Sequence, residues 1–178
     1  MSTQGFNFNA AHSDRWSVSF TNLPTITDPR DLAMYDRFVK SLVLPDYNMG
    51  EIISRGPFGF QVRHQAIPLP NVDLSQLQIE FKLNETMKNY LNIFGWMRNL
   101  KYAEELDPKE EFVRNNTIKG ILLTVMDNQK RPVAVLTFTK CFLLSLSSLS
   151  LDTGSSEEIS FTCNFSYEEI KYEERSIV

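Results

Sequence analysis

Cysteine and histidine are scarce in this sequence, which limits the kinds of site that it can build. Cys141, Cys163, His12 and His64 are the only residues of these types among 178. The two cysteines lie on separate segments and form no CxxC pair, so we expect two buried thiols and no metal site. A disulfide across neighbouring strands is the alternative that the sequence leaves open. No cofactor is predicted.

Basic charge and long apolar runs are also limited. Acidic residues outnumber basic residues by 22 to 18, which gives a net charge of −4. A dedicated nucleic-acid binder normally carries a strong basic excess, so this balance argues against one. No apolar stretch approaches the ~18 residues of a membrane span, and residues 1–14 contain no basic cluster followed by an apolar run. We therefore expect no membrane segment and no signal peptide.

The residue patterns of known catalytic sites are missing as well. The sequence contains no GxSxG, P-loop, dinucleotide-binding, HExxH or EF-hand pattern. His12 falls in the expected N-terminal arm and His64 in the glycine- and proline-rich excursion, where a lone histidine is more often a surface residue than a base. Acidic pairs such as Glu104 and Glu105 are adjacent, and adjacent side chains on a strand point to opposite faces. Because no acid, base or nucleophile has a supporting partner, we expect that the protein is not an enzyme.

The chain does contain the pattern of one strand-rich domain spanning residues 1–178. Its length and its 42% apolar residues suit a single globular domain. Strict alternation of apolar and polar residues predicts the clearest strand at residues 76–83. A hairpin is predicted from residues 118–127 and 131–142, turning at residues 127–130. The other predicted strands are residues 16–21, 35–44, 51–54, 60–65 and 158–170.

One strong helix is predicted at residues 85–100, with Asn84 and Thr86 as caps. Its apolar stripe is formed by Met87, Tyr90, Leu91, Phe94 and Met97. A short helix is also expected to open at Asp28 and Pro29. Residues 1–15 are expected to be an N-terminal arm, and residues 171–178 a charged tail. The predicted fold class is mainly β with one α-helix (α+β), an antiparallel β-sandwich or half-barrel.

The glycine- and proline-rich residues 46–67 predict a hairpin that projects from the domain. Its apolar residues have few core partners nearby in the sequence, which suggests that they dock on another surface. The predicted contacts between subunits or rings are Met49, Ile52, Ile53, Phe58 and Phe60.

Two predicted strands have one apolar face and one polar face. The polar residues are Gln76, Gln78, Glu80, Ser160, Thr162, Asn164, Ser166 and Glu168. Such faces belong either to an ordinary solvent-facing sheet or to the lining of a water-filled channel. A wide β-channel needs more strands than this chain can supply, so a ring of subunits would have to build it. A ring would also remove the exposed sheet edges.

Several stretches of the sequence, taken in chain order, resemble those of a known protein family. They are residues 16–24 (WSVSFTNLP), residues 38–45 (FVKSLVLP), the excursion to Pro70, residues 77–81 (LQIEF), the helix with Trp96, and the strands near residues 133–142 and 159–167. From residue 16 to residue 172 the chain resembles the tail tube proteins of contractile-tailed bacteriophages. Related tubes occur in type VI secretion and in contractile injection systems.

The resemblance implies a specific assembly. Such proteins form hexameric rings that stack, and their inner sheets join into one ring-shaped β-barrel. The implied partners are a tail sheath protein outside, a baseplate tube initiator and a tail terminator at the ends, and genomic DNA passing transiently through the lumen. The protein would be made in the host cytoplasm and reside in the virion. The eight polar residues above would line the lumen, because neutral and acidic groups do not hold phosphates.

Two other functions fit the same sequence features. A baseplate tube initiator or a neck-joining protein would share the fold and cap one end of the tube. From a different class, a small β-barrel ligand-binding module would have an internal pocket with the helix at its mouth.

Overall fold

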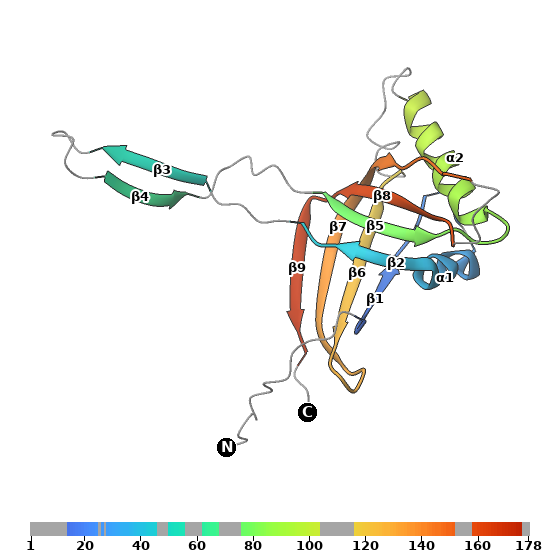
Figure 1. Cartoon of the computed structure of the whole chain (residues 1–178), viewed down its shortest axis with the longest axis horizontal. Helices are drawn as coiled ribbons and strands as arrows, with labels where there is room; N and C mark the ends of the chain where they lie inside the picture. Colours follow the sequence, from blue (N-terminus) through green and yellow to red (C-terminus); the bar gives the residue numbers. More distant parts are fainter. Residues whose placement is uncertain are drawn as a thin grey trace.

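The protein is mainly antiparallel sheet with two helices (Figure 1). The computed structural model describes residues 14–24, 26, 28–45, 50–55, 62–67, 76–103, 116–151 and 158–175. All statements on the fold concern these residues, and those on residues 50–55 and 62–67 concern the backbone alone. In chain order the elements are β1 (Trp16–Phe20), α1 (Pro29–Phe38), β2 (Val39–Val43), β3 (Gly50–Arg55), β4 (Val62–Ile67), β5 (Leu77–Lys82), α2 (Lys88–Ala103), β6 (Ile118–Met126), β7 (Pro132–Leu146), β8 (Ser160–Ser166) and β9 (Glu169–Glu174).

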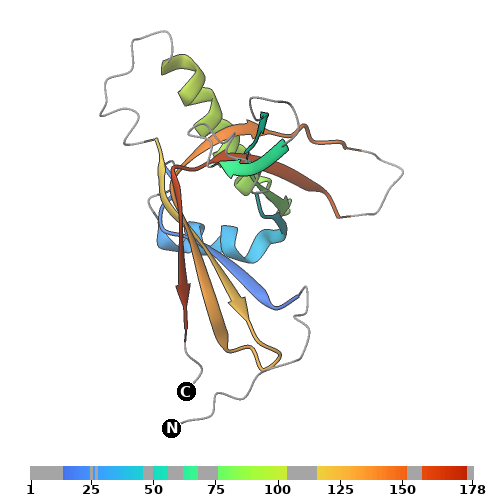
Figure 2. The ribbon, with the colours of Figure 1, turned by 90° about the vertical axis from the view of Figure 1, so that its left-hand side faces the viewer.

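Seven strands form one folded sheet whose centre is the long strand β7. The order is β1-β6-β7-β8-β5-β2, and β9 also pairs with β7. The N-terminal part of β7 pairs with β6 and β9, whereas its C-terminal part pairs with β8. We call β1, β6, β9 and the start of β7 the first half, and β2, β5, β8 and the end of β7 the second half. Figure 2 shows the strands of the two halves running in different directions.

The change of direction occurs at Lys140. Its φ of 50° lies in the left-handed region that non-glycine residues rarely adopt. Thr139 is the last residue of β7 that pairs with β9, and Phe142 is the first that pairs with β8. A single backbone distortion therefore lets one strand belong to both halves of the sheet.

The two halves pack face to face around an aromatic core. The Phe20 ring on β1 lies 6.0 Å from the Phe81 ring on β5, and Phe81 stacks at 5.5 Å on Phe161 of β8. Cys141 and Cys163 are buried in this core as free thiols, so the expectation of two buried thiols is confirmed. The alternating strands predicted at residues 76–83 and 158–170 bury the predicted faces, including Ile79.

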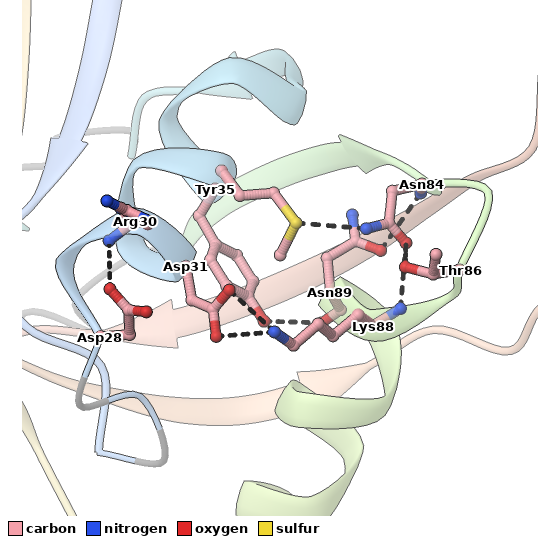
Figure 3. A network of polar contacts seen from close by, with 9 residues as sticks. Asp28, Arg30, Asp31, Tyr35, Asn84, Thr86, Lys88 and Asn89 are labelled. Atoms are coloured by element: carbon pink, nitrogen blue, oxygen red, sulfur yellow. Dashed lines mark hydrogen bonds and ion pairs between the residues drawn. The ribbon is translucent and has the colours of Figure 1, made fainter.

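Helix α1 corrects two sequence expectations. Asp28 caps it as predicted, accepting the Arg30 N–H at 2.8 Å (Figure 3), and Pro29 is the first residue of the helix. The helix then runs to Phe38, so residues 35–38 are helical and the predicted strand begins only at Val39. No β-branched residue occurs from Pro29 to Phe38, which favours a helix over that whole stretch. The described residues therefore contain two helices, and α1 is longer than the short helix expected at Asp28 and Pro29.

Helix α2 begins three residues later than predicted and turns a different face to the core. Leu91 and Phe94, which were expected in the buried stripe, are 55% and 48% exposed. Ile93 and Trp96 are buried instead. Asn89 explains the rotation, because its buried side chain donates to the Lys82 carbonyl at 2.8 Å and holds the first turn against the end of β5.

The C-terminal segment is also more ordered than a tail. Residues Glu169–Glu174 form β9, which pairs with β7 from Thr139 to Ala134. The predicted last strand is thus divided into β8 and β9, with a bend at residues 167–168. This segment can be highly charged because β9 is an edge strand, and its side chains are mostly exposed.

The predicted projecting hairpin appears as the strand pair β3–β4. Gly50 pairs with Ile67 and Arg55 with Val62. Figure 1 shows this pair lying well to the left of the main sheet. Residues 56–61, which connect these two strands, lie outside the described residues.

Candidate assembly site

The second half of the sheet presents one continuous polar face. Across it, Gln78 of β5 pairs with Asn164 of β8, Glu80 pairs with Thr162, and Lys82 pairs with Ser160. Six of the eight predicted channel residues share this face: Gln78, Glu80, Ser160, Thr162, Asn164 and Ser166. Gln76 lies just before β5, and Glu168 lies beyond the end of β8.

Glu80 is the centre of a polar network on this face. Its carboxylate accepts hydrogen bonds from Lys40 at 2.8 Å, Ser41 at 2.9 Å and Ser160 at 2.5 Å. A β-bulge between Val39 and Ser41 brings two donors of β2 opposite this one carboxylate. The Lys40 ammonium, followed by the Ser160 hydroxyl, holds the pKa of Glu80 at about 2. Glu80 therefore stays ionised and ties three strands together.

The polar face also carries two lysines, Lys82 of the predicted alternating strand and Lys40 of β2. Lys40 is paired with Glu80, and Lys82 forms an ion pair with Glu158 at 2.6 Å. A paired cation attracts phosphate less than a free one because the carboxylate offsets its charge. The face thus keeps the neutral-to-acidic character that the sequence indicated.

Among the described residues, no strand pairs with either outer edge of this half of the sheet, and both edges carry exposed apolar side chains. At one edge, Val43 of β2 is 54% exposed and the following Leu44 is 47% exposed. At the other edge, Leu144 of β7 is 43% exposed, in a β-bulge between Leu143 and Ser145. Exposed backbone edges with apolar side chains are typical of surfaces that pair with another chain. Sequence reasoning missed these residues, since strand pattern alone does not say which strand is at an edge.

Helix α1 covers a further edge strand, β1. Beside β1, the Phe20 N–H donates to the Asp36 carboxylate of α1 at 3.2 Å. Burial raises the pKa of Asp36 above its usual value, and the Phe20 N–H partly offsets this. Strand β1 is therefore less available for pairing than β2 or the end of β7.

The predicted contact residues of the hairpin are only partly described. Ile52 and Ile53 lie in β3, opposite Gln65 and His64 of β4. Met49, Phe58 and Phe60 lie outside the described residues. No described residues form a group of three or more His, Cys, Asp or Glu side chains that could hold a metal ion. In the same part of the chain, no helix is long and apolar enough to span a membrane.

Several solved structures have a similar arrangement of strands and helices. The tube-terminating cap of the anti-feeding prophage is similar over 98% of this chain and 100% of its own, with 13% identity and a TM-score of 0.61. A chain of the PVC sheath–tube complex, an extracellular contractile injection system, is similar over 93% of both chains, with 12% identity and a TM-score of 0.60.

The chain has the fold of contractile injection system tube and cap proteins. A chain of the PVC sheath/tube terminator is similar as well, with 12% identity, a TM-score of 0.61 and coverage of 93% of this chain and 97% of that one. No family model and no curated protein sequence matches. The resemblance to tube proteins indicated by the sequence is confirmed at the level of the fold.

Proposed function

We propose that this chain is a structural subunit that joins head to tail with copies of itself into a ring, and that such rings form the tube of a contractile tail. The observation that carries the proposal is the pair of edges on the polar half of the sheet that no described strand covers, both with exposed apolar residues. A β-sheet with two open edges is completed when each edge pairs with the opposite edge of another copy.

The strand directions support this way of joining. The polar half contains four strands, β2, β5, β8 and the end of β7, and each pairs antiparallel with its neighbour. Strand β2 therefore runs opposite to β7. When β2 of one copy lies beside β7 of the next in a ring, the alternation of directions continues without a break. Val43 and Leu144 then lie at the same junction, since Val43, Gln78, Asn164 and Ser145 form one row across the sheet.

The closed ring places the polar face on the inside. In our proposal the rings are hexamers, the tube belongs to a phage tail, and genomic DNA passes through the lumen into the host. The protein acts as a scaffold and not as an enzyme, and it is assembled in the host cytoplasm before residing in the virion. Support comes from the charge of the polar face, where Lys40 and Lys82 are both paired with carboxylates.

Outer partners would contact the opposite side of the sheet. Tyr90 of α2 contacts the core-facing ring of Phe161 at 5.3 Å, so α2 lies on the side away from the polar face. We assign the exposed Leu91 and Phe94 on this helix to contact with a tail sheath protein. A baseplate initiator and a tail terminator would contact the first and last rings.

We also propose that the β3–β4 hairpin reaches the adjoining ring. The apolar sequence of Ile52 and Ile53, together with Met49, Phe58 and Phe60, supports this role. Replacing Ile53 or Phe58 with Asp should leave single rings and prevent their stacking, because an unpaired charge would be buried. Normal tubes from both variants would overturn this part of the proposal.

A tube cap or initiator is the second candidate function. The cap of the anti-feeding prophage, which matches this chain over nearly its whole length, favours it. Such a protein would form rings but not polymerise alone. It would also be scarce in the particle, whereas a tube protein would be abundant.

Negative-stain electron microscopy of the purified full-length chain tests the proposal. Tubes with an axial hole would support the main tube protein, and single rings would support the cap or initiator. A stable monomer at high concentration, even with a tube template, would overturn both candidates. If that monomer bound an apolar ligand in an internal cavity, a small β-barrel binding module would be the better description.

A further inference from the structure

Helix α1 carries an open hollow on its exposed side. The hollow has a volume of about 350 Å³ and is lined by Arg30, Ala33, Met34, Arg37 and Phe38. Its wall is apolar between two arginines that are seven residues apart, or about 10 Å along a helix axis. Among the described residues, neither guanidinium has an ion-pair partner, whereas the nearby Lys88 is paired with Asp31 at 2.8 Å. The hollow therefore suits an apolar group accompanied by negative charge.

Strand β9 offers a group of this kind. Tyr172 is 62% exposed, although it lies in a strand and opposite Leu136 of β7. Glu174 lies two residues further along, so its side chain is on the same face as Tyr172, about 7 Å away. Glu173 points to the other face. Neither glutamate has an ion-pair partner among the described residues.

The hollow and this face of β9 cannot meet within one copy. Helix α1 lies beside the outer edge of β1, where Asp36 accepts the Phe20 N–H. Strand β9 pairs with the other side of β7, so β6 and β7 separate it from β1. Figure 1 shows α1 and β9 on opposite sides of the domain. Two surfaces that are complementary but opposite can be joined only head to tail, between different copies.

We propose that β9 of one copy docks on the α1 hollow of the next copy, with Tyr172 in the hollow and Glu174 facing Arg30 and Arg37. The Tyr172 ring packs on Ala33, Met34 and Phe38, and the arginines contact its face and the nearby carboxylate. This inference rests on the proposed self-assembly. It adds a contact that is separate from the pairing of β2 with β7, and it lies on the other half of the sheet.

Site-directed crosslinking tests the contact directly. The double variant Ala33→Cys/Glu174→Cys, treated with a short bismaleimide linker, should give a ladder of trimers and larger species on a denaturing gel. The native Cys141 and Cys163 are fully buried and should not compete. The matched control Ala33→Cys/Glu173→Cys moves the thiol to the opposite face of β9, and its ladder should be at least tenfold weaker.

The outcomes separate this inference from the proposed function. If the wild-type protein forms rings but the two variants give equal ladders or none, the β9–α1 contact is overturned. The proposed function then stays intact. A product that stops at dimers would overturn the head-to-tail arrangement. A clear ladder from a protein that forms no rings would support the contact and overturn the ring.

Charge reversal gives a second readout that needs no cysteine. The variant Arg30→Glu/Arg37→Glu should raise the concentration needed for assembly about tenfold, because attraction to Glu174 becomes repulsion. Combining it with Glu174→Arg should restore most of the loss, whereas combining it with Glu173→Arg should not. Unchanged assembly of the reversed variant would overturn the proposal.

Discussion

The Tyr35 hydroxyl on α1 donates a hydrogen bond to the main-chain carbonyl of Asn89 on α2, at 3.0 Å (Figure 3). Tyr35 and Asn89 are both fully buried. Nearby, Lys88 of α2 is paired with Asp31 of α1 at 2.8 Å. The two helices are thus joined through their first turns and their buried faces, although they lie far apart in the sequence.

Replacing Tyr35 with Phe should lower the free energy of unfolding by about 1 kcal/mol, because a buried carbonyl loses its donor while the ring packing is kept. Urea denaturation would measure this change. Tyr172→Phe is the matched control, since Tyr172 is 62% exposed, and it should change the stability little. Equal effects of the two substitutions would contradict a role for the Tyr35 hydroxyl.

The rotated face of α2 can be tested with two neighbouring apolar residues. Ile93→Ala should cost about 2–5 kcal/mol of unfolding free energy, because it leaves a cavity in the core. Leu91→Ala, at a position that is 55% exposed, should cost less than about 1 kcal/mol. Chemical denaturation of both variants distinguishes this orientation from the one in which Leu91 is buried.

The free edges predict which substitutions weaken ring formation. Val43→Glu and Leu144→Glu should each weaken ring formation, because each puts a charge in place of an apolar side chain where β2 of one copy lies beside β7 of the next. Gln78→Glu is the matched control, since Gln78 lies in the same row but in the middle of the sheet. Sedimentation velocity would measure the assembled fraction. An unchanged assembled fraction in both edge variants would rule out this junction.

Glu80 predicts a specific dependence of stability on pH. Its pKa is lowered from 4.5 to about 2 in the folded state, so its ionised form contributes stability above about pH 4.5. That contribution is lost as the pH falls through about 2. Glu80→Gln should therefore be less stable at neutral pH and lose less on acidification through this window. Thermal unfolding across pH 2 to 6 would show it, and parallel curves for variant and wild type would argue against the network.

The two thiols should be unreactive in the native state. Burial raises the pKa of Cys141 to about 12 and raises that of Cys163 as well, so almost no thiolate forms near neutral pH. Both residues are also inaccessible to solvent. Labelling with an aromatic disulfide reagent should therefore require unfolding, and two thiols should react in denaturant. Rapid labelling of the native protein would contradict this burial.

The strands were the most predictable part of the fold, because their signal is local. Alternation such as that of Leu77, Ile79 and Phe81 with polar residues fixes both the strand and its buried face. The turn at Asp127 was also evident, and there the Asp127 carboxylate accepts the N–H groups of Gln129 and Arg131. The polar face of the candidate site followed from the same alternation.

The features that sequence reasoning missed depend on contacts between distant segments. The face that α2 buries is set by the bond of Asn89 to the end of β5, and the apolar stripe through Leu91 gives no hint of it. Strand β9 looked like a tail because its pairing with β7 cannot be read from its charges. Likewise, Val43 and Leu144 become candidate junction residues only once the strand order identifies the edges.

The backbone turn at Lys140 has a mechanical consequence. Strand β7 continues through it from one half of the sheet to the other, and β8 and β9 keep the same register with β7 on either side, with Phe142 opposite Ser166 and Thr139 opposite Glu169. A load applied along the polar half reaches the rest of the domain through a covalent strand as well as through side-chain packing. The two halves cannot slide past one another without breaking the hydrogen bonds of β7, so each subunit should resist shear as a single rigid block.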